Sequence, residues 1–480
     1  MYLRAAVTLT ALTLLGSAAA ADPPGQQPSH SPPELATTRQ ADRILQDVWR
    51  QEHVTPTARC EDGVFLRRVS LDLIGRVPTL AEWRRFEADP DRAGLVAALV
   101  ESQEFAEFWS HALVTQWYGR QRIPGADREV LRLWLRDALE QRLPYDRIAT
   151  ALIVAEGGSA TNGPVNLLLR HGEQAGAKLS RVFLGVRLDC AQCHDHPFDR
   201  WTQDDYQRMQ RFFAGVRVSP ISEGNLRLSN AEPRGGADRE PTPRFLTGAS
   251  PRSMRWRDEF ALFAVSSKPF ARTFANRVWY HFLGRGIVDP IDDFGAHNPP
   301  VSGELLELLA TSARSSRFDL RAMCRVICAT EAYQASSATD NPLGERGRLF
   351  AVRTVKPLTV EQHLRSLEAV AGQALPRPAR EELRGALLGE ALDEDQSRLW
   401  EHRESDQALL TRLTLPTNAL QGSPAMEARV SPQSDQSLDI LFARMLCRRP
   451  TDAERAVCGQ WPLAEVAAAL LHSHEFCLNH

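Results

Sequence analysis

The sequence predicts a mainly α-helical fold, with two helical domains joined by an irregular segment rich in Pro and Gly. Apolar residues recur at helical spacing from about residue 36 to 215, and again from about residue 251 to the C-terminus. Runs with strand-like alternation are few. The length of 480 residues also exceeds what one simple core would need, so more than one domain is expected.

The composition is that of an ordinary globular protein, with 43% hydrophobic and 24% charged residues. The formal net charge is −3, and Arg residues are scattered among acidic ones. Nucleic-acid binding usually requires a concentrated positive field. The sequence therefore predicts no nucleic-acid partner.

The first 21 residues are typical of an export signal peptide. Arg4 supplies the positive start, residues 5–15 form a short apolar run, and residues 18–21 are small alanines suited to cleavage. The run is too short for a confident membrane span, and no later stretch is long and apolar enough to cross a bilayer. We expect a periplasmic or extracellular protein with no integral membrane span after signal cleavage.

The remaining chain divides by composition. Residues 22–36 read as a Pro-rich linker and residues 37–216 as a first helical domain. Residues 217–250 hold many Pro, Gly and charged residues, which favours a loop-rich connection with room for a short hairpin. Residues 251–480 form the second helical domain.

A short sequence pattern that is typical of a helix start occurs twice. Residues 78–82 and 450–454 both read Pro-Thr-x-Ala-Glu, in which Thr can cap a helix start while Glu reaches back. Each is followed at similar distance by a related close, at residues 99–105 and 470–476, and residues 327–333 look like a looser third copy. The pattern predicts recurrent helix hairpins and does not support a solenoid, because the copies are unevenly spaced.

The most specific chemical signal is Cys190-Ala191-Gln192-Cys193-His194, the attachment pattern of c-type haem. Two thiols at this spacing can bond the haem vinyl groups, and the adjacent imidazole can ligate the iron. Apolar residues before the motif recur at helical spacing, which predicts that it ends an amphipathic helix that Pro197 would stop.

If haem is bound, His194 is the proximal ligand, and a distal ligand would tune the iron. Met209, in a predicted helix over residues 202–215, and His297 are the candidates. Two alternatives stay open. Cys190, Cys193, His194 and His196 could instead bind zinc or non-haem iron. The two cysteines could also form a disulfide in a structural loop.

A second polar cluster follows a predicted amphipathic helix over residues 274–286, which we expect to end near a Gly. Asp292, Asp293 and His297 could form an acid–base or metal site, or could simply order a loop by capping its backbone groups. Familiar hydrolase and nucleotide motifs are missing, so the sequence leaves open whether the protein is an enzyme.

The spacing of the other six cysteines does not determine which of them pair in disulfides. Cys324 and Cys328 share a helix face and are expected to be buried. One bridge is expected among Cys447, Cys458 and Cys477, which lie close in sequence.

The first domain resembles the planctomycete cytochrome-like domain family of the second type. The segments that carry the resemblance are residues 65–75, 78–79 and 183–186, and the run 190–198 that contains the haem-like motif. The second domain resembles the companion that usually follows this family. The segments concerned are residues 276–279, 284–286, 292–295 and 473–480.

Both families have no known function, so the resemblance implies a domain order and no reaction. The cytochrome label of the first family rests on the same Cys-x-x-Cys-His pattern. Many relatives carry an additional cytochrome c domain, whereas this chain has one such motif, which weakens a multihaem interpretation. Relatives are often encoded beside exported sulfatase-like proteins, which suggests such a protein as a partner. If haem is bound, a redox protein is the other expected partner.

Overall fold

The structure is a computed structural model that describes residues 31–119, 123–232, 242–338, 344–388 and 435–480. The described residues are mainly helical with few, short strands, so the predicted fold class is confirmed. Among them, no helix is both long and apolar enough to cross a membrane. The predicted signal peptide lies outside the described residues.

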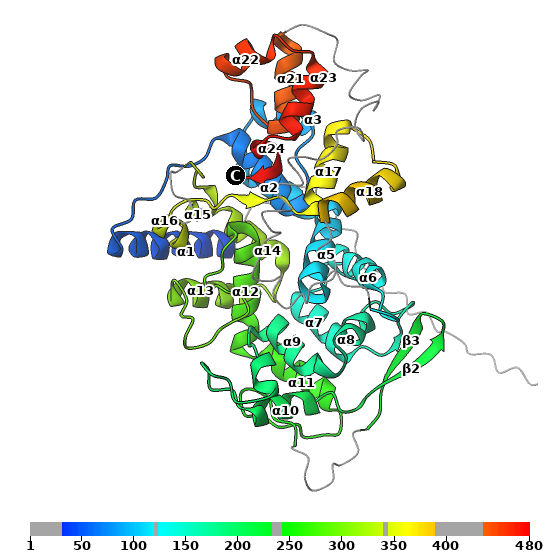
Figure 1. The fold of residues 1–480 in the computed structure, drawn as a ribbon. Coiled ribbons are helices and arrows are strands. Elements are labelled where there is room, and N and C mark those ends of the chain that lie inside the picture. Colours follow the sequence, from blue (N-terminus) through cyan, green and yellow to red (C-terminus); the bar gives the residue numbers. More distant parts are fainter. Residues whose placement is uncertain (1–30, 120–122, 233–241, 339–343, 389–434) are drawn as a thin grey trace, which may run out of the picture.

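Ten helices precede the hairpin region in the described part of the chain (Figure 1). They are α1 (Pro32–Gln51), α2 (Asp62–Ile74), α3 (Leu80–Ala88), α4 (Arg92–Glu101), α5 (Gln103–Tyr118), α6 (Arg128–Glu140), α7 (Tyr145–Val154), α8 (Val165–His171), α9 (Ala175–Leu184) and α10 (Gln203–Arg211).

The helices that follow are α11 (Trp256–Ser266), α12 (Lys268–Leu283), α13 (Gly303–Ser315), α14 (Leu320–Cys328), α15 (Glu331–Gln334), α16 (Glu345–Arg348), α17 (Val360–Ala371), α18 (Arg377–Leu388), α21 (Asp435–Leu446), α22 (Asp452–Cys458), α23 (Leu463–Leu471) and α24 (His474–Cys477). As the sequence predicts, α12 ends beside a glycine, because Gly284 caps it in the left-handed conformation at φ 74°.

The first helix begins inside the predicted linker over residues 22–36. Pro32 occupies the first position of α1, where its missing N–H costs nothing, and Ser31 and Glu34 form a reciprocal capping box. The prolines therefore start a helix here, and the linker prediction is wrong for residues 32–36.

Strands are short and antiparallel. β2 (Val216–Ser222) and β3 (Asn225–Asn230) form a hairpin within the predicted loop-rich connection, and β1 (Gly157–Gly158) pairs with the other edge of β3. A separate pair joins β4 (Lys356–Pro357) to β5 (Leu478–Asn479), which attaches the end of the chain to its middle.

The main hydrophobic core does not stop at the connection between the two predicted domains. It takes most of its buried residues from α1 to α14, on both sides of residues 217–250, and further ones from α15, residues 349–351 and α21. A second, smaller core lies among α17, α18 and α21–α24 in the upper part of Figure 1, and Leu71 and Val77 join it from the first domain. The two domains therefore fold against each other.

The pattern that occurs twice in the sequence has the same geometry in both places. Thr79 and Thr451 each form the expected capping box. In the first copy, Arg76 donates to Glu82 at 2.8 and 3.0 Å and to Glu104 at 2.7 Å.

In the second copy, Arg448 makes the same four-bonded clamp on Glu454 and Glu475, at 2.7–2.8 Å. Each arginine therefore ties the start of one helix to the start of another.

A buried carboxylate ties the two domains and the C-terminal segment together. Asp72 in α2 is 0% exposed. Its oxygens accept from Lys356 at 2.6 Å and Asn479 at 2.8 Å, and from Tyr333 at 3.0 Å and Arg353 at 3.4 Å. We call these five residues the Asp72 hub.

The hub keeps its carboxylate ionised. Burial alone would raise the pKa of Asp72, but Lys356, Arg353 and His281 outweigh it and hold this pKa below its usual range. The stability gained from the charged form is therefore present above the pKa of an unfolded Asp, about 3.9, and is lost as the pH falls through the folded-state value.

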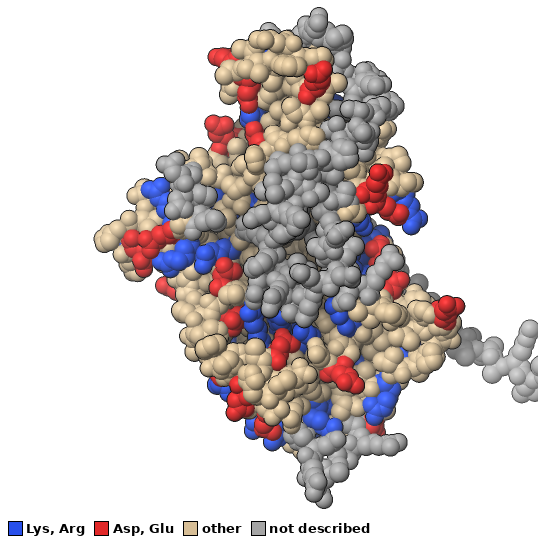
Figure 2. Space-filling view, viewed as in Figure 1, with Lys and Arg blue, Asp and Glu red and all other residues tan. Residues whose placement is uncertain are grey.

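Charge on the surface is mixed. On the face drawn in Figure 2, acidic and basic side chains of the described residues lie interspersed. The charge of this face is therefore not gathered into one large patch of a single sign.

Asp72→Asn should strongly destabilise the protein, because Lys356 and Arg353 would keep their charges in a buried site without a carboxylate. We expect a loss of about 3–5 kcal/mol, the usual cost of breaking a buried ion pair, measured by chemical denaturation at neutral pH. The matched control is Asp47→Asn on the exposed face of α1, where Asp47 pairs with Arg50 and the change should stay within about 0.5 kcal/mol. Equal midpoints for the two variants would contradict the role given to the hub.

Candidate functional site

The Cys-x-x-Cys-His motif lies in the connection between α9 and α10. The expectation that it ends an amphipathic helix is wrong, because α9 ends at Leu184. Gly185 adopts the left-handed conformation at φ 65°, and a Cβ there would lie 2.4 Å from the ring of Phe294. The motif itself starts in a 3₁₀ turn over Asp189–Gln192.

The chemically active groups of the motif face solvent. Cys190 and Cys193 are exposed free thiols, and His194 is exposed. The Nδ1 of His194 lies 2.8 Å from the carbonyl oxygen of Asp195, so in the neutral ring Nδ1 carries the proton and donates there, which leaves Nε2 with its lone pair. That tautomer is the one a metal-ligating histidine needs.

Other residues hold the loop in place. Asp189 pairs with Lys178 at 2.9 Å, and Leu188 and Ala191 are fully buried. Gln203 donates its backbone N–H to the Asp195 carboxylate at 2.9 Å and its side chain to a motif carbonyl at 3.2 Å. The two thiols are therefore not required to fix the loop.

The neighbouring histidine has the opposite tautomer. The N–H of Phe198 donates to Nδ1 of His196 at 3.2 Å, so the ring proton of neutral His196 lies on Nε2. The N–H of His196 in turn donates to the carbonyl of Trp201 at 2.8 Å. In this conformer His196 is a loop-ordering residue.

The second predicted polar cluster meets the motif loop. The ring of His297 stacks on that of His196 with centroids 6.3 Å apart, and it also contacts exposed Phe198 at 6.5 Å. Nε2 of His297 donates to Asp293 at 3.1 Å. The motif loop belongs to the first sequence domain and His297 to the second, so this ring contact joins the two. A hydrogen bond from the N–H of Phe294 to the carbonyl of Gly185, at 2.9 Å, joins them a second time.

Asp292 faces the first domain and not the Asp293–His297 pair. It is 1% exposed and accepts from Arg181 at 2.5 Å and Arg187 at 2.7 Å. Burial alone would raise the pKa of Asp292, but these arginines and Arg277 hold it below its usual range. Asp292 is therefore favoured in its charged form, and its bonds to Arg181 and Arg187 hold residues 292–297 against the segment that leads into the motif.

The remaining candidate ligands are dispersed. Met209 is 0% exposed and belongs to the main core, where α10 packs against α9. Among the residues that the structure describes, no group of three or more His, Cys, Asp or Glu side chains is arranged to hold a metal ion.

The expected bridge among the C-terminal cysteines is not formed. Cys447, Cys458 and Cys477 form no disulfide with one another. Cys477 donates to the carbonyl of Leu471 at 3.6 Å, and Cys447 contacts Arg67, so the two buried thiols have other partners. Cys324 and Cys328 are both 0% exposed, as predicted.

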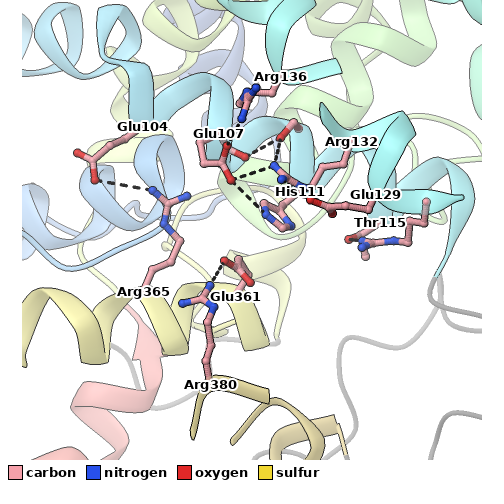
Figure 3. Close-up of polar contacts among 12 residues, drawn as sticks. Glu104, Glu107, His111, Thr115, Glu129, Arg132, Arg136, Glu361, Arg365 and Arg380 are labelled. Atoms are coloured by element: carbon pink, nitrogen blue, oxygen red, sulfur yellow. Dashed lines mark hydrogen bonds and ion pairs between the residues drawn. The ribbon is translucent and has the colours of Figure 1, made fainter. Parts of the chain in front are cut away.

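Sequence reasoning missed a polar cluster on α5 (Figure 3). Glu107 accepts from Arg132 of α6 at 2.9 Å and lies 3.5 Å from His111, one turn along the same helix. His111 and Arg132 hold the pKa of Glu107 down at about 2, so it stays ionised. Arg365 of α17 approaches the same face, with Glu104 at 3.7 Å. The four-residue spacing was the available signal, but its partners are distant in sequence.

Comparison with known families reproduces the domain order. A family model described as "Protein of unknown function (DUF1549)", PSCyt2, matches residues 40–218. A second, described as "Protein of unknown function (DUF1553)", PSD1, matches residues 257–405. No curated protein and no solved structure matches the chain.

The motif thiols should react first in the native, cofactor-free protein. Cys190 and Cys193 are exposed, whereas burial raises the pKa of the Cys324, Cys328 and Cys447 thiols well above its usual value. We expect a fast phase of two thiols with Ellman's reagent.

Cys190→Ser and Cys193→Ser should each remove one thiol from the fast phase, whereas Cys324→Ser should remove none. The partly exposed Cys458 should react more slowly. A fast phase that survives both motif substitutions would contradict the observed exposure.

The role of Asp292 beside the motif can be tested with two adjacent carboxylates. Asp292→Asn should cost about 3–5 kcal/mol of unfolding free energy, because Arg181 and Arg187 would lose a buried partner. Asp293→Asn is the matched control and should cost clearly less, since Asp293 is more exposed and bonds the half-exposed His297. Chemical denaturation separates them, and an equal or inverted order would contradict this role of Asp292.

Proposed function

The chain carries a DUF1549 domain followed by a DUF1553 domain, two families without a known function, and from its site we propose that it is an exported c-type haem protein with a redox or electron-transfer role. The observation that carries the proposal is the state of Cys190, Cys193 and His194. All three are exposed, and both thiols are free.

The residues present fit the group. Cys190 and Cys193 would hold the porphyrin by thioether bonds, and Nε2 of His194 would ligate the iron, since its Nδ1 already donates to a carbonyl. When bound, haem would supply one-electron chemistry. The exposed ring of Phe198, 75% accessible, supplies apolar surface beside the motif.

His297 is the better distal candidate. It lies on the same side of the molecule as the motif loop, because it stacks on His196, and it comes from the other domain. Met209 is fully buried in the main core and could ligate only after the core reorganised. A haem at this site would therefore report on contact between the domains.

Location and partners belong to the same proposal. An export signal over residues 1–21 would deliver the chain to the periplasm or the extracellular space, where haem attachment in bacteria takes place. A redox protein or an exported sulfatase-like protein would be the partner. The open position of the motif suits electron exchange with a second protein.

The proposal predicts a covalent haem adduct when the full chain is exported in a bacterial host that has cytochrome c maturation machinery. Intact mass should rise by one haem, and the visible spectrum should show a reducible Soret band. Cys193→Ala should prevent normal attachment, and His194→Ala should alter the spectrum. Cys458→Ala, a substitution outside the motif, should match the unmodified protein.

A colourless protein of unmodified mass in that host would overturn the proposal. Metal analysis of the same sample would then test the alternative, a secreted scaffold or binding module whose Cys/His loop holds zinc or iron. With neither haem nor metal, the loop would be structural.

A further inference from the structure

The structure contains a cavity that the haem proposal does not use. It has a volume of about 280 Å³ and lies where α2 and α4 meet α14 and α15. None of its lining residues belongs to the motif loop or to the polar loop beside it. Both family domains contribute to its wall, and ligand sites favour such junctions.

Four uncharged lining residues, which we call the floor of the cavity, form an apolar part of its wall. Phe65 and Val96 come from the first domain, and Ala329 and Cys328 from the second. Cys328 is buried, which raises the pKa of its thiol well above its usual value, so the thiol is neutral. The floor therefore favours a small aliphatic or aromatic group.

One of the two lining arginines is committed to the fold. Arg92 bonds Asp62 at 2.7 Å, the carbonyl of Cys60 at 2.6 Å and the side chain of Gln334 at 3.1 Å, and it stacks on Phe65. Its donors are satisfied, so it shapes the cavity and is not available to a ligand.

The other charged groups at the cavity are available. Arg59 is exposed, and within the described ranges its guanidinium makes no hydrogen bond or ion pair. One carboxylate oxygen of Asp91 accepts a hydrogen bond from the N–H of Gly94 at 2.9 Å, which caps α4. The second oxygen is left for another donor. Among the described side chains, these two opposite charges share one cavity without forming an ion pair with each other.

We propose that this cavity binds a free α-amino acid with an aliphatic side chain. Arg59 would bind the carboxylate, Asp91 the ammonium group, and the floor of Phe65, Val96 and Ala329 the side chain. The carboxylate and ammonium groups of an amino acid can pair with both charges at once, whereas a simple acid or amine can pair with only one of them. The volume lies just below the usual range of ligand sites, about 300–1,000 Å³, and suits one amino acid rather than a cofactor.

The test is calorimetric titration of the full mature chain with three matched probes. L-Leucine carries both charges, 4-methylpentanoate lacks the ammonium group, and 3-methylbutylamine lacks the carboxylate. We expect saturable one-site binding of L-leucine, and at least tenfold weaker binding of the other two.

Two substitutions give a crossed pattern. Arg59→Gln should weaken L-leucine and the acid at least tenfold and leave the amine unchanged. Asp91→Asn should weaken L-leucine and the amine and leave the acid unchanged, while Asn preserves the helix cap. Arg84→Gln, at an exposed arginine of α3 outside the cavity, is the control and should change none of the three.

Several outcomes would overturn the proposal. One is no heat from any probe at millimolar concentration. Another is equal binding of the three probes, which would make the cavity a nonspecific apolar site. A third is L-leucine binding that survives both Arg59→Gln and Asp91→Asn, because the ligand would then lie elsewhere. Thermal unfolding of each variant without ligand shows whether the fold is intact, so a failed fold is not read as lost binding.

Discussion

The fold depends on the carboxylate of Asp72. A buried charge is tolerable only when it is paired and hydrogen-bonded, and the partners of Asp72 come from parts of the chain hundreds of residues apart. Lys356 and Asn479 lie in the two strands that pair the middle of the chain with its end. The hub therefore fixes where the C-terminal segment docks, and through it the position of the smaller core.

A buried carboxylate paired with cationic side chains also lies next to the candidate site. Asp292 is a second buried carboxylate, and Arg181 and Arg187, which donate hydrogen bonds to it, belong to the other domain. Because the main core is continuous across residues 217–250, the two family domains form one folded body in which each supplies charges that the other must neutralise. The stability of the motif loop is thus coupled to the domain that follows it.

Much of the local structure could be predicted from the sequence, because the signals act within one turn. The capping boxes at Thr79 and Thr451 and the glycine that ends α12 are of this kind. The end of α9 was misjudged because the apolar spacing continues past it, although Gly185, which ends the helix in the left-handed conformation, is a local signal of the same kind. Apolar periodicity predicts which face of a helix is buried, but not which residues pack against that face.

The candidate site was predictable in part. The motif at Cys190 was visible because its spacing is local, but its meeting with His297 depends on a contact across about a hundred residues. The arginine partners of Asp292 were invisible for the same reason. The four-residue spacing of Glu107 and His111 was visible in the sequence, but the partner Arg132 lies on the next helix. The structure adds a difference in exposure between two groups of cysteines in the same chain. Cys324 and Cys328 are buried as packing groups, whereas the motif thiols are exposed in a loop that other residues hold. A structural motif would show the reverse, with its cysteines used by the fold, so this contrast favours a ligand over a purely structural role.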